Sequence, residues 1–390
     1  MKFKASSLII SLSLVGVLTW KVTADNSPSF GDPFANLTPD LEARFDAGKE
    51  EFTAEEDVSE GLGPVFNDVS CGACHSNPAV GGDSGIVETR FGTITHNQFD
   101  PLTQLGGSLI QSQGIGPADA CFGETIPTQA TIQARRKTPP LFGLGLVDNV
   151  LDSLLQQIAK DQKQNTPDIA GRPNMVKDVA TGHLAVGRFG WKAQVATLMT
   201  FSGDAYLNEM GITNPLFPTE NAPQGDASLL AICDTVADPE DDGAGIQAFA
   251  DFMSLLAPPP RGPITQSVLN GERIFSAIGC AACHVPTLQT GPNPSKALDR
   301  VTFHPFSDFL LHDMGSLGDR IEQGQASGTE MRTAPLWGLR VRKSFLHDAR
   351  ATKIEDAILA HDGQGQQAKN KFSGLNSKDK HDLIAFLNSL

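Results

Sequence analysis

Two stretches of the chain, SCGACHSN and GCAACHVP, each carry the pattern Cys-x-x-Cys-His. The first copy supplies Cys71, Cys74 and His75, and the second supplies Cys280, Cys283 and His284. Thiols at this spacing lie about one helical turn apart and can add to the two vinyl groups of a haem, while the adjacent imidazole binds the iron. The repeated motif therefore predicts two covalently attached c-type haems, with one histidine of each copy as an iron ligand.

Three other uses of the motif fit less well. A zinc site pairs one Cys-x-x-Cys with a second Cys or His pair nearby, whereas these copies are far apart and each ends in its own histidine. A thioredoxin-like redox pair needs neither the trailing histidine nor a second copy. A disulfide between thiols so close in sequence would be strained.

Haem of this kind is attached outside the cytoplasm, which predicts an export signal at the N-terminus. Residues 1–24 fit a signal peptide, because two lysines precede an apolar run from Leu8 to Trp20 and small residues, Val22 and Ala24, stand before a cleavage site. The apolar run is too short for the ~20 residues of a membrane-spanning helix, so a retained anchor is the weaker alternative. We expect cleavage after Ala24 and a soluble, periplasmic mature chain.

The net charge of the chain limits the classes of molecule that it could bind. Its 390 residues carry a formal net charge of -15 at pH 7. Such an acidic surface argues against nucleic acid and against an anionic membrane as partners. A small electron-carrier protein with a basic docking face, such as a cytochrome or a cupredoxin, would suit it, although acidity also serves solubility alone.

The chain divides at a proline-rich linker, LLAPPPRGP, from Leu255 to Pro263. Apolar residues at helical spacing precede the linker, and a second amphipathic pattern after it leads directly into GCAACH. An amphipathic helix that leads into a haem motif is typical of the start of a cytochrome c domain. Near the C-terminus, Leu383, Leu387 and Leu390 share one helical face, and we expect their helix to pack across the one before the second motif.

A second repeat supports a duplicated architecture. TPPLFGL, which begins at Thr138, can be laid on TAPLWGL, which begins at Thr333, and each copy follows its own haem motif. We therefore predict a mainly α protein with two cytochrome c-like domains, at residues 25–257 and 264–390. Long irregular loops rich in the 38 glycines and 25 prolines should connect the helices, and strands should be few and short.

Several longer stretches together resemble one known family: FNDVSCGACHSNPAVGG, RRKTPPLFGLGLVDNV, GRFGWKAQVATL, EMGITNPLFP, LLHDMG, and RTAPLWGL followed by FLHDARATKIEDAILAH. As a set they look like the bacterial di-haem thiol-oxidoreductase family of peroxidases. That family is similar in turn to the di-haem cytochrome c peroxidases and to the di-haem enzyme that oxidises tryptophans in a precursor protein. The resemblance runs over nearly the whole mature chain.

The resemblance implies catalytic residues on the distal side of the N-terminal haem. The peroxidases have a Gln and a Glu-Met-Gly element there, and WKAQ and NEMG supply Gln194 and Glu209 in this chain. A partly buried carboxylate can move a proton from the inner to the outer peroxide oxygen during O–O cleavage. Trp191 is the implied aromatic relay between the haems. As alternatives, Gln194 and Glu209 are surface or cap residues of helices, and Trp191 is a core residue.

The resemblance also bears on the remaining iron ligands. The peroxidases have a distal His soon after the first motif, and this chain has none at the matching place, so either His96 is the ligand or the N-terminal haem is five-coordinate. The candidates after the second motif are Met314, Met331, His347 and His361. His361 falls where the peroxidase pattern has the distal Met, and His347 where it has a His near the haem. We expect a bis-His C-terminal haem of lowered potential with His361 as ligand, and Met314 is the alternative.

The other cysteines and histidines have weaker signals. Cys121 and Cys233 are two thiols in an oxidising compartment, which favours a disulfide between them, and their surroundings show no feature that would lower a thiol pKa. The remaining histidines without a motif are expected at the surface: His183, His304 and His381. The related peroxidases hold a calcium ion between their domains, but no acidic loop in this sequence predicts its ligands.

Together these features predict a periplasmic di-haem c-type cytochrome oxidoreductase that is peroxidase-like and passes electrons between its two haems. Reducing peroxide to water takes two electrons, which two irons can store. Two alternatives stay open: a non-catalytic electron-transfer cytochrome with both irons closed, and an enzyme that oxidises thiols or a protein and uses peroxide as the oxidant. A high-spin band in the oxidised spectrum, or cyanide binding, would reveal an open iron.

Overall fold

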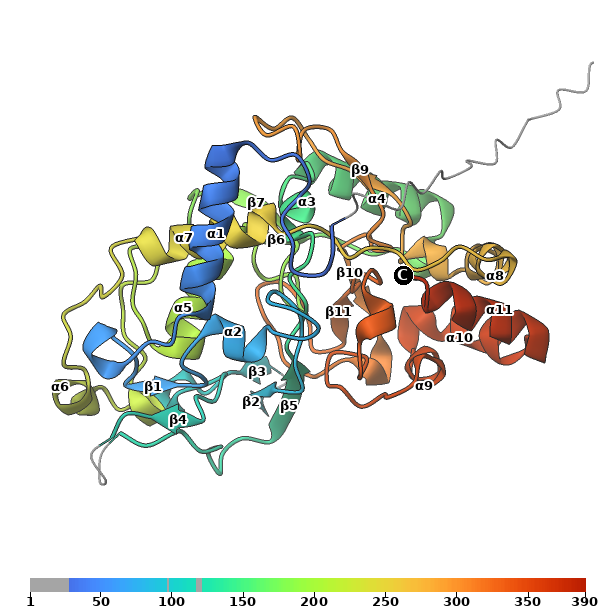
Figure 1. Cartoon of the computed structure of the whole chain (residues 1–390). Helices are drawn as coiled ribbons and strands as arrows, with labels where there is room; N and C mark the ends of the chain where they lie inside the picture. Colours follow the sequence, from blue (N-terminus) through green and yellow to red (C-terminus); the bar gives the residue numbers. More distant parts are fainter. Residues whose placement is uncertain (1–27, 97, 117–120) are drawn as a thin grey trace, which may run out of the picture.

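The structure is a computed structural model that describes residues 28–96, 98–116 and 121–390 (Figure 1). The predicted signal peptide, residues 1–24, lies outside the described residues. Within the described ranges, no helix combines the length and the apolar character needed to cross a membrane.

The described chain mixes helices with short strands. The helices are α1 Pro39–Thr53, α2 Cys71–Cys74, α3 Leu144–Asp148, α4 Asp152–Asn165, α5 Leu198–Met210, α6 Leu230–Cys233, α7 Ala244–Leu255, α8 Gln266–Ala277, α9 Ile354–Leu359, α10 Gln366–Ser373 and α11 Ser377–Leu387. The strands are β1 Val65–Phe66, β2 Val87–Thr95, β3 Gln98–Asp100, β4 Gln113–Gly114, β5 Ile132–Lys137, β6 Asn174–Lys177, β7 Leu184–Gly187, β8 Leu288–Gln289, β9 Thr302–Phe303, β10 Leu311–Asp313 and β11 Glu330–Arg332.

The predicted mainly α fold class is therefore wrong. The structure is 37% helical and 15% strand, and its strands form several small antiparallel sheets. The segments expected to be irregular loops pair with one another, because a long loop that crosses the interior must satisfy its backbone N–H and C=O groups. The expectation of two domains, at residues 25–257 and 264–390, stays a prediction.

The three-stranded sheet, in the order β3-β2-β5, matters most for the site. β2 and β5 run antiparallel, with Val87 opposite Lys137 and Gly92 opposite Ile132. Along β5 the buried residues alternate with exposed ones, as expected of a strand with one face turned inward. Unusually, charged residues such as Arg136 lie on the buried side of this sheet.

Helices α1, α5 and α7 pack together around the first haem motif, on the left of Figure 1. The crossing of α1 and α7 is close because Gly48 has no side chain: a Cβ there would lie 2.3 Å from the carbonyl oxygen of Ala248. Aromatic rings fill the contact, including Phe52 and Phe252 with ring centroids 4.8 Å apart. These residues belong to the larger hydrophobic core.

Helices α8 and α11 pack across each other beside the second motif, as the sequence predicted. Gly271 allows this contact, since a Cβ there would lie 2.0 Å from the carbonyl oxygen of Asp382. The smaller hydrophobic core, which includes Phe275 and Phe386, lies between these helices. Figure 1 shows α8 to α11 gathered on the side of the molecule opposite α1.

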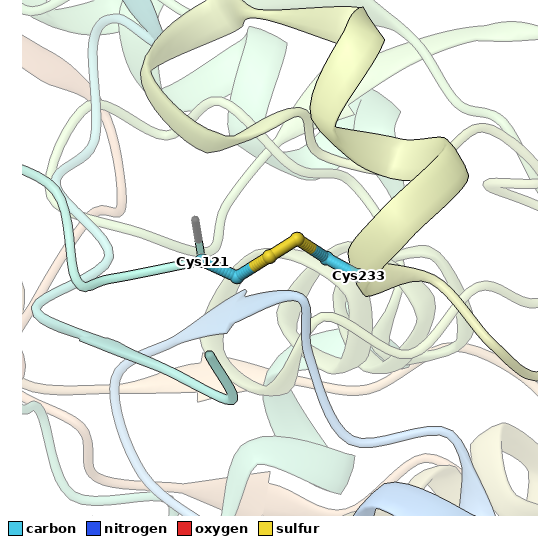
Figure 2. Close-up of a disulfide and its surroundings, with 2 residues drawn as sticks. All are labelled: Cys121 and Cys233. Atoms are coloured by element: carbon cyan, nitrogen blue, oxygen red, sulfur yellow. A yellow bond between two sulfur atoms is a disulfide. The ribbon is translucent and has the colours of Figure 1, made fainter. Parts of the chain in front are cut away.

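A disulfide joins Cys121 to Cys233 at the end of α6, as the sequence favoured (Figure 2). Both cysteines are buried, and their Cα atoms are 6.1 Å apart. The bond ties the loop that contains Cys121 to the end of α6, across a sequence separation of 112 residues.

Candidate di-haem site

The first Cys-x-x-Cys-His motif forms a short helix followed by its histidine. The side chain of Ser70 caps α2 by accepting a hydrogen bond from the N–H of Ala73 at 3.2 Å. His75 follows the helix, and its Nδ1 lies 3.1 Å from the carbonyl oxygen of Gly82. A carbonyl oxygen can only accept, so Nδ1 carries the proton and Nε2 keeps its lone pair.

The second motif repeats this arrangement. It forms a short 3-10 turn, Cys280–Ala282, after α8, and Gly279 allows the turn with its positive φ of 99°. The Nδ1 of His284 lies 3.0 Å from the carbonyl oxygen of Phe306, which again leaves Nε2 as a lone-pair donor.

The protonation states of both motifs suit haem attachment. Burial lowers the pKa of His75 and of His284 to about 4, so both imidazoles are neutral at pH 7. A neutral imidazole whose Nδ1–H is held by a carbonyl is the usual form of a histidine that binds a metal. All four motif cysteines are free thiols. The donor set therefore fits two haem irons and the vinyl groups that c-type attachment consumes.

A cavity of about 260 Å³ opens beside the second motif. Its walls are mostly apolar, and it extends from His284 past Trp191 to Leu144 and Phe201 in the N-terminal half. The candidate ligands named from the sequence, Met314, Met331, His347 and His361, all line this cavity. The structure thus brings the expected residues of the C-terminal haem together around one apolar space.

His361 and His284 both line this cavity, with their ring centroids 6.5 Å apart. An imidazole nitrogen lies about 1.1 Å from its ring centre, so two rings that bind one metal from opposite sides at about 2 Å have centroids about 6.2 Å apart. The Nδ1 of His361 lies 2.8 Å from the carbonyl oxygen of Ala357, so its Nε2 is also a lone-pair donor. Met314 lies close by, because both residues contact Gly365.

Trp191 is fixed in the wall of the same cavity. Its Nε1–H donates to the carbonyl oxygen of Lys137 at 2.9 Å, and its own carbonyl oxygen accepts from the N–H of Arg332 at 2.9 Å. The ring of His347 lies edge-on to the indole, with centroids 6.2 Å apart. His347 is thus a neighbour of Trp191, and burial lowers its pKa to about 4.

Two arginines that the sequence reasoning missed, Arg332 and Arg342, also line the cavity. Arg332 donates to the carbonyl oxygen of Gly190 at 2.6 Å and Arg342 to that of Trp337 at 3.0 Å, and neither forms an ion pair with another described residue. The Nε of Arg342 is buried without a hydrogen-bond partner. Burial lowers the pKa of both guanidinium groups to about 10, and the charge of Arg342 adds to the effect on Arg332. Two neighbouring buried cations that form no ion pair within the described residues fit the propionate groups of a haem.

Glu209, at the end of α5, lies next to the first motif. Its Oε2 accepts a hydrogen bond from the Nδ2 of Asn67 at 2.8 Å. Burial, and then the charge of Glu88, raise the pKa of Glu209 to about 8. Glu88 stays ionised because Arg90 donates to it at 2.9 Å. Burial, and then the charge of Glu209, raise the pKa of the Cys74 thiol to about 12, which also shows how near the carboxyl group lies.

Gln194 and His96 do not join this group. Gln194 accepts from the N–H of Lys192 at 3.2 Å and lines a second cavity of about 180 Å³ with Arg90 and Asp204, and Glu209 is not among the lining residues. His96 lies exposed at the turn between β2 and β3, with a positive φ of 53°.

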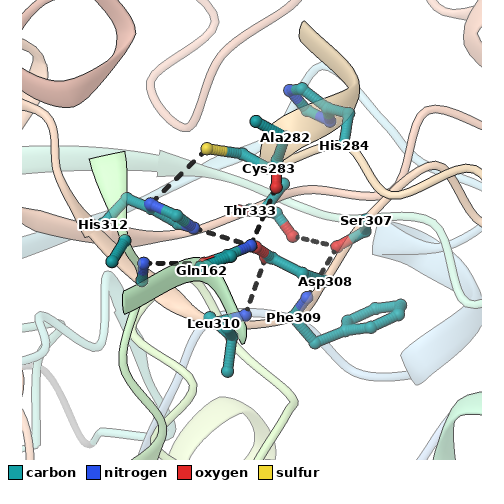
Figure 3. A network of polar contacts seen from close by, with 12 residues as sticks. Gln162, Ala282, Cys283, His284, Ser307, Asp308, Phe309, Leu310, His312 and Thr333 are labelled. Atoms are coloured by element: carbon teal, nitrogen blue, oxygen red, sulfur yellow. Dashed lines mark hydrogen bonds and ion pairs between the residues drawn. The ribbon is translucent and has the colours of Figure 1, made fainter. Parts of the chain in front are cut away.

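The sequence reasoning also missed a polar network under the second motif, around Asp308 and His312 (Figure 3). The Nε2 of His312 lies 2.9 Å from Asp308, and its Nδ1 lies 3.5 Å from the Sγ of Cys283. Gln162, from α4, donates both to Asp308 and to the carbonyl oxygen of Ala282 at 2.8 Å. Burial opposes a charged imidazole, but the charge and hydrogen bond of Asp308 outweigh it and raise the pKa of His312 well above its usual value. The network fixes the second thiol of the motif.

Comparison with known proteins agrees with this chemistry. A family model described as "Di-haem oxidoreductase, putative peroxidase" matches residues 125–390. Because the match covers most of the chain, the protein belongs to this family of di-haem oxidoreductases. A comparison with curated proteins finds no match.

Three solved structures are similar to this chain at low identity. The diheme peroxidase BthA from Burkholderia thailandensis is 14% identical, with 90% of this chain and 86% of that one covered and a TM-score of 0.42. A MauG-like protein associated with microbial copper homeostasis is 14% identical, with 94% of each chain covered and a TM-score of 0.41. The hydrazine synthase of Kuenenia stuttgartiensis is 15% identical, with 99% and 100% covered and a TM-score of 0.40.

Proposed function

We propose that this protein is a periplasmic c-type cytochrome oxidoreductase that uses two covalently bound haems as a peroxidase. The observation that carries the proposal is the pair of Cys-x-x-Cys-His motifs, each with free thiols and a neutral imidazole whose Nε2 is a lone-pair donor. Two irons suit a two-electron reduction of peroxide, and membership of a di-haem oxidoreductase family supports the same reaction class.

In this proposal the residues of each motif divide the work of holding a haem. Cys71 and Cys74 bind one macrocycle and His75 its iron, and the second motif does the same for the other haem. His361 would be a second ligand of the C-terminal iron, and the ring separation of 6.5 Å from His284 supports that role. The exposed position of His96 supports a five-coordinate iron at the first motif.

Glu209 is the proposed proton carrier. When bound, the haems would supply the two electrons, and two protons from solvent would complete the reduction of peroxide to two waters. An Oε atom of the ionised Glu209 takes the proton from one peroxide oxygen and returns it to the other. Asn67 orients this carboxyl group through its hydrogen bond. Trp191, in the wall of the cavity, is the proposed aromatic bridge between the haems, and a small electron-carrier protein is the proposed electron donor.

An optical titration of the haem-loaded protein tests the proposal. The oxidised spectrum should show one low-spin and one high-spin haem, dithionite should reduce both, and peroxide should then reoxidise them with turnover. Cyanide should bind to one iron. Two low-spin haems without cyanide binding or peroxide turnover would instead identify a non-catalytic electron-transfer cytochrome.

A further inference from the structure

An acidic cluster lies in the N-terminal half, apart from the haem cavity and the motifs. One carboxylate oxygen from each of Glu220, Asp238 and Glu240 lies within 4.8 Å of the other two. Glu220 comes from the loop after α5, and the other two come from the loop before α7. Asp238 and Glu240 are neighbours in sequence, whereas Glu220 comes from a different loop, so the fold brings its carboxyl group to the other two.

Glu220 has a buried oxygen without a hydrogen-bond partner. The residue is only 8% exposed, and although its Oε1 accepts from the N–H of Asn221 at 2.7 Å, its Oε2 has no partner. A buried carboxylate oxygen without a donor is costly, on the order of 1–3 kcal/mol or more for a charged group. The unpaired oxygen belongs to the group that faces Asp238 and Glu240, so it points to a positively charged ligand at that place.

Thr213 lies within hydrogen-bond distance of both Asp238 and Glu240. This fully buried residue donates its N–H to Glu240 at 2.8 Å. Its single hydroxyl lies within hydrogen-bond distance of both Asp238, at 2.9 Å, and Glu240. One hydroxyl proton can serve only one of these acceptors. The hydroxyl therefore cannot serve both carboxylates, and the exposed Asp238 is open to a further ligand, either water or a cation.

The surrounding charges do not supply that cation. Among the ion pairs between described residues, none includes Glu220, Asp238 or Glu240. Burial, and then the charges of Glu240 and Asp238, raise the pKa of Glu220 to about 9, and Asp234 adds a fourth negative charge nearby. The raised pKa of Glu220 and its unpaired Oε2 both indicate that the cluster lacks a nearby positive charge.

We propose that Glu220, Asp238 and Glu240 bind a calcium ion that ties the loop after α5 to the loop before α7. Carboxylate oxygens without nitrogen or sulfur ligands suit a hard cation, and calcium accepts the irregular geometry that loops provide. The site lies within the N-terminal half and does not involve the proposed domain boundary. It would steady the end of α5, which carries Glu209.

Calcium binding to the haem-loaded protein, first treated with a chelator and then freed of it, tests the proposal. Isothermal titration should give one strong calcium site, and calcium should raise the thermal midpoint of the wild-type protein. Glu220→Gln and Asp238→Asn should each weaken binding at least tenfold and remove the thermal shift. The control Glu124→Gln removes a buried carboxylate whose oxygens accept backbone N–H groups, and it should bind calcium like the wild type.

Two outcomes would overturn the proposal. A wild-type protein that binds no calcium would show that a shared proton, rather than a cation, links the carboxylates. Binding that survives both Glu220→Gln and Asp238→Asn would place the ion elsewhere. Since Glu220→Gln relieves repulsion between like charges, we expect the variant to fold, and in chelator its thermal midpoint should equal or exceed that of the wild type.

Discussion

Replacing Glu209 by Gln tests the proposed proton transfer directly. The variant keeps the size of the side chain and the hydrogen bond to Asn67, but it cannot accept a proton. We expect peroxide reduction to slow by about 10²–10⁴-fold, as for other lost acid–base groups, while the resting haem spectrum stays nearly unchanged. The control is Glu56→Gln, because Glu56 is a half-buried carboxyl near Cys71 that also has a raised pKa but is hydrogen-bonded to Tyr206.

The pH dependence of peroxide turnover tests the role of Glu209 a second way. With a pKa of about 8, about one tenth of Glu209 is ionised at pH 7 and half at pH 8. If the ionised form takes the proton from peroxide, kcat/KM should rise about fivefold between pH 7 and 8 and then level off. Steady-state peroxide turnover with a reduced carrier protein measures this profile. A Glu209→Gln variant with wild-type turnover, or with an unchanged rise through pH 8, would refute the role of Glu209.

The same pKa also predicts an effect on stability. The pKa of Glu209 in the folded protein is above that of the unfolded chain, so its contribution to stability is fully present below about pH 4.5 and is lost as pH rises toward 8. Glu209→Gln has no such loss. Its free energy of unfolding relative to the wild type should therefore increase between pH 5 and 8, by an amount on the order of a few kcal/mol. Urea unfolding at several pH values would measure it, and a constant difference would contradict the raised pKa.

Other predictions concern the haems and the disulfide. Mass spectrometry of the mature protein should show the chain plus two haems, and a single haem would contradict the assignment of one motif. His361→Ala should turn the C-terminal haem high-spin in electron paramagnetic resonance while Met314→Ala leaves it low-spin, and the reverse result would make Met314 the ligand. Arg342→Leu should lower the reduction potential of one haem, because it removes a buried positive charge, whereas Arg342→Lys should not; equal potentials would exclude the propionate contact. Replacing Cys121 and Cys233 by Ser should lower the free energy of unfolding by about 2–5 kcal/mol in urea without changing the haem spectrum, and an unchanged midpoint would show that the bond does not stabilise the fold.

The sequence predicted local features of the fold better than its long-range pairings. The amphipathic patterns around the linker and at the C-terminus correctly indicated α7, α8 and α11, because helical periodicity is a local signal. The sheets were missed because their partners are far apart in sequence: β2 pairs with β5, and β3 and β4 lie between them along the chain. The alternation of buried and exposed residues in β5 was a usable signal, but its charged inward residue, Arg136, hides the apolar pattern that identifies strands.

In the site, too, the sequence predicted residues that a motif marks but not their distant partners. Motif spacing was enough to find His75 and His284, yet the carbonyl groups that set their protonation come from Gly82 and Phe306, which no motif marks. Glu209 was found by resemblance alone. Its raised pKa depends on burial and then on the charge of Glu88, which lies on a strand of the missed sheet.

The two motifs differ in what faces their imidazoles, and this difference bears on how a two-haem peroxidase would divide its work. His361 faces His284 at a separation suited to a metal between them, so the proposed C-terminal iron is closed and suited to storing an electron. His96, the candidate partner at the first motif, is exposed. The carboxyl group of Glu209 lies beside that motif, and its raised pKa means that it holds a proton near neutral pH. An open iron needs a proton carrier, whereas a closed one has no use for it. The position of Glu209 therefore favours peroxide chemistry at the N-terminal haem, with the C-terminal haem as the reservoir for the second electron.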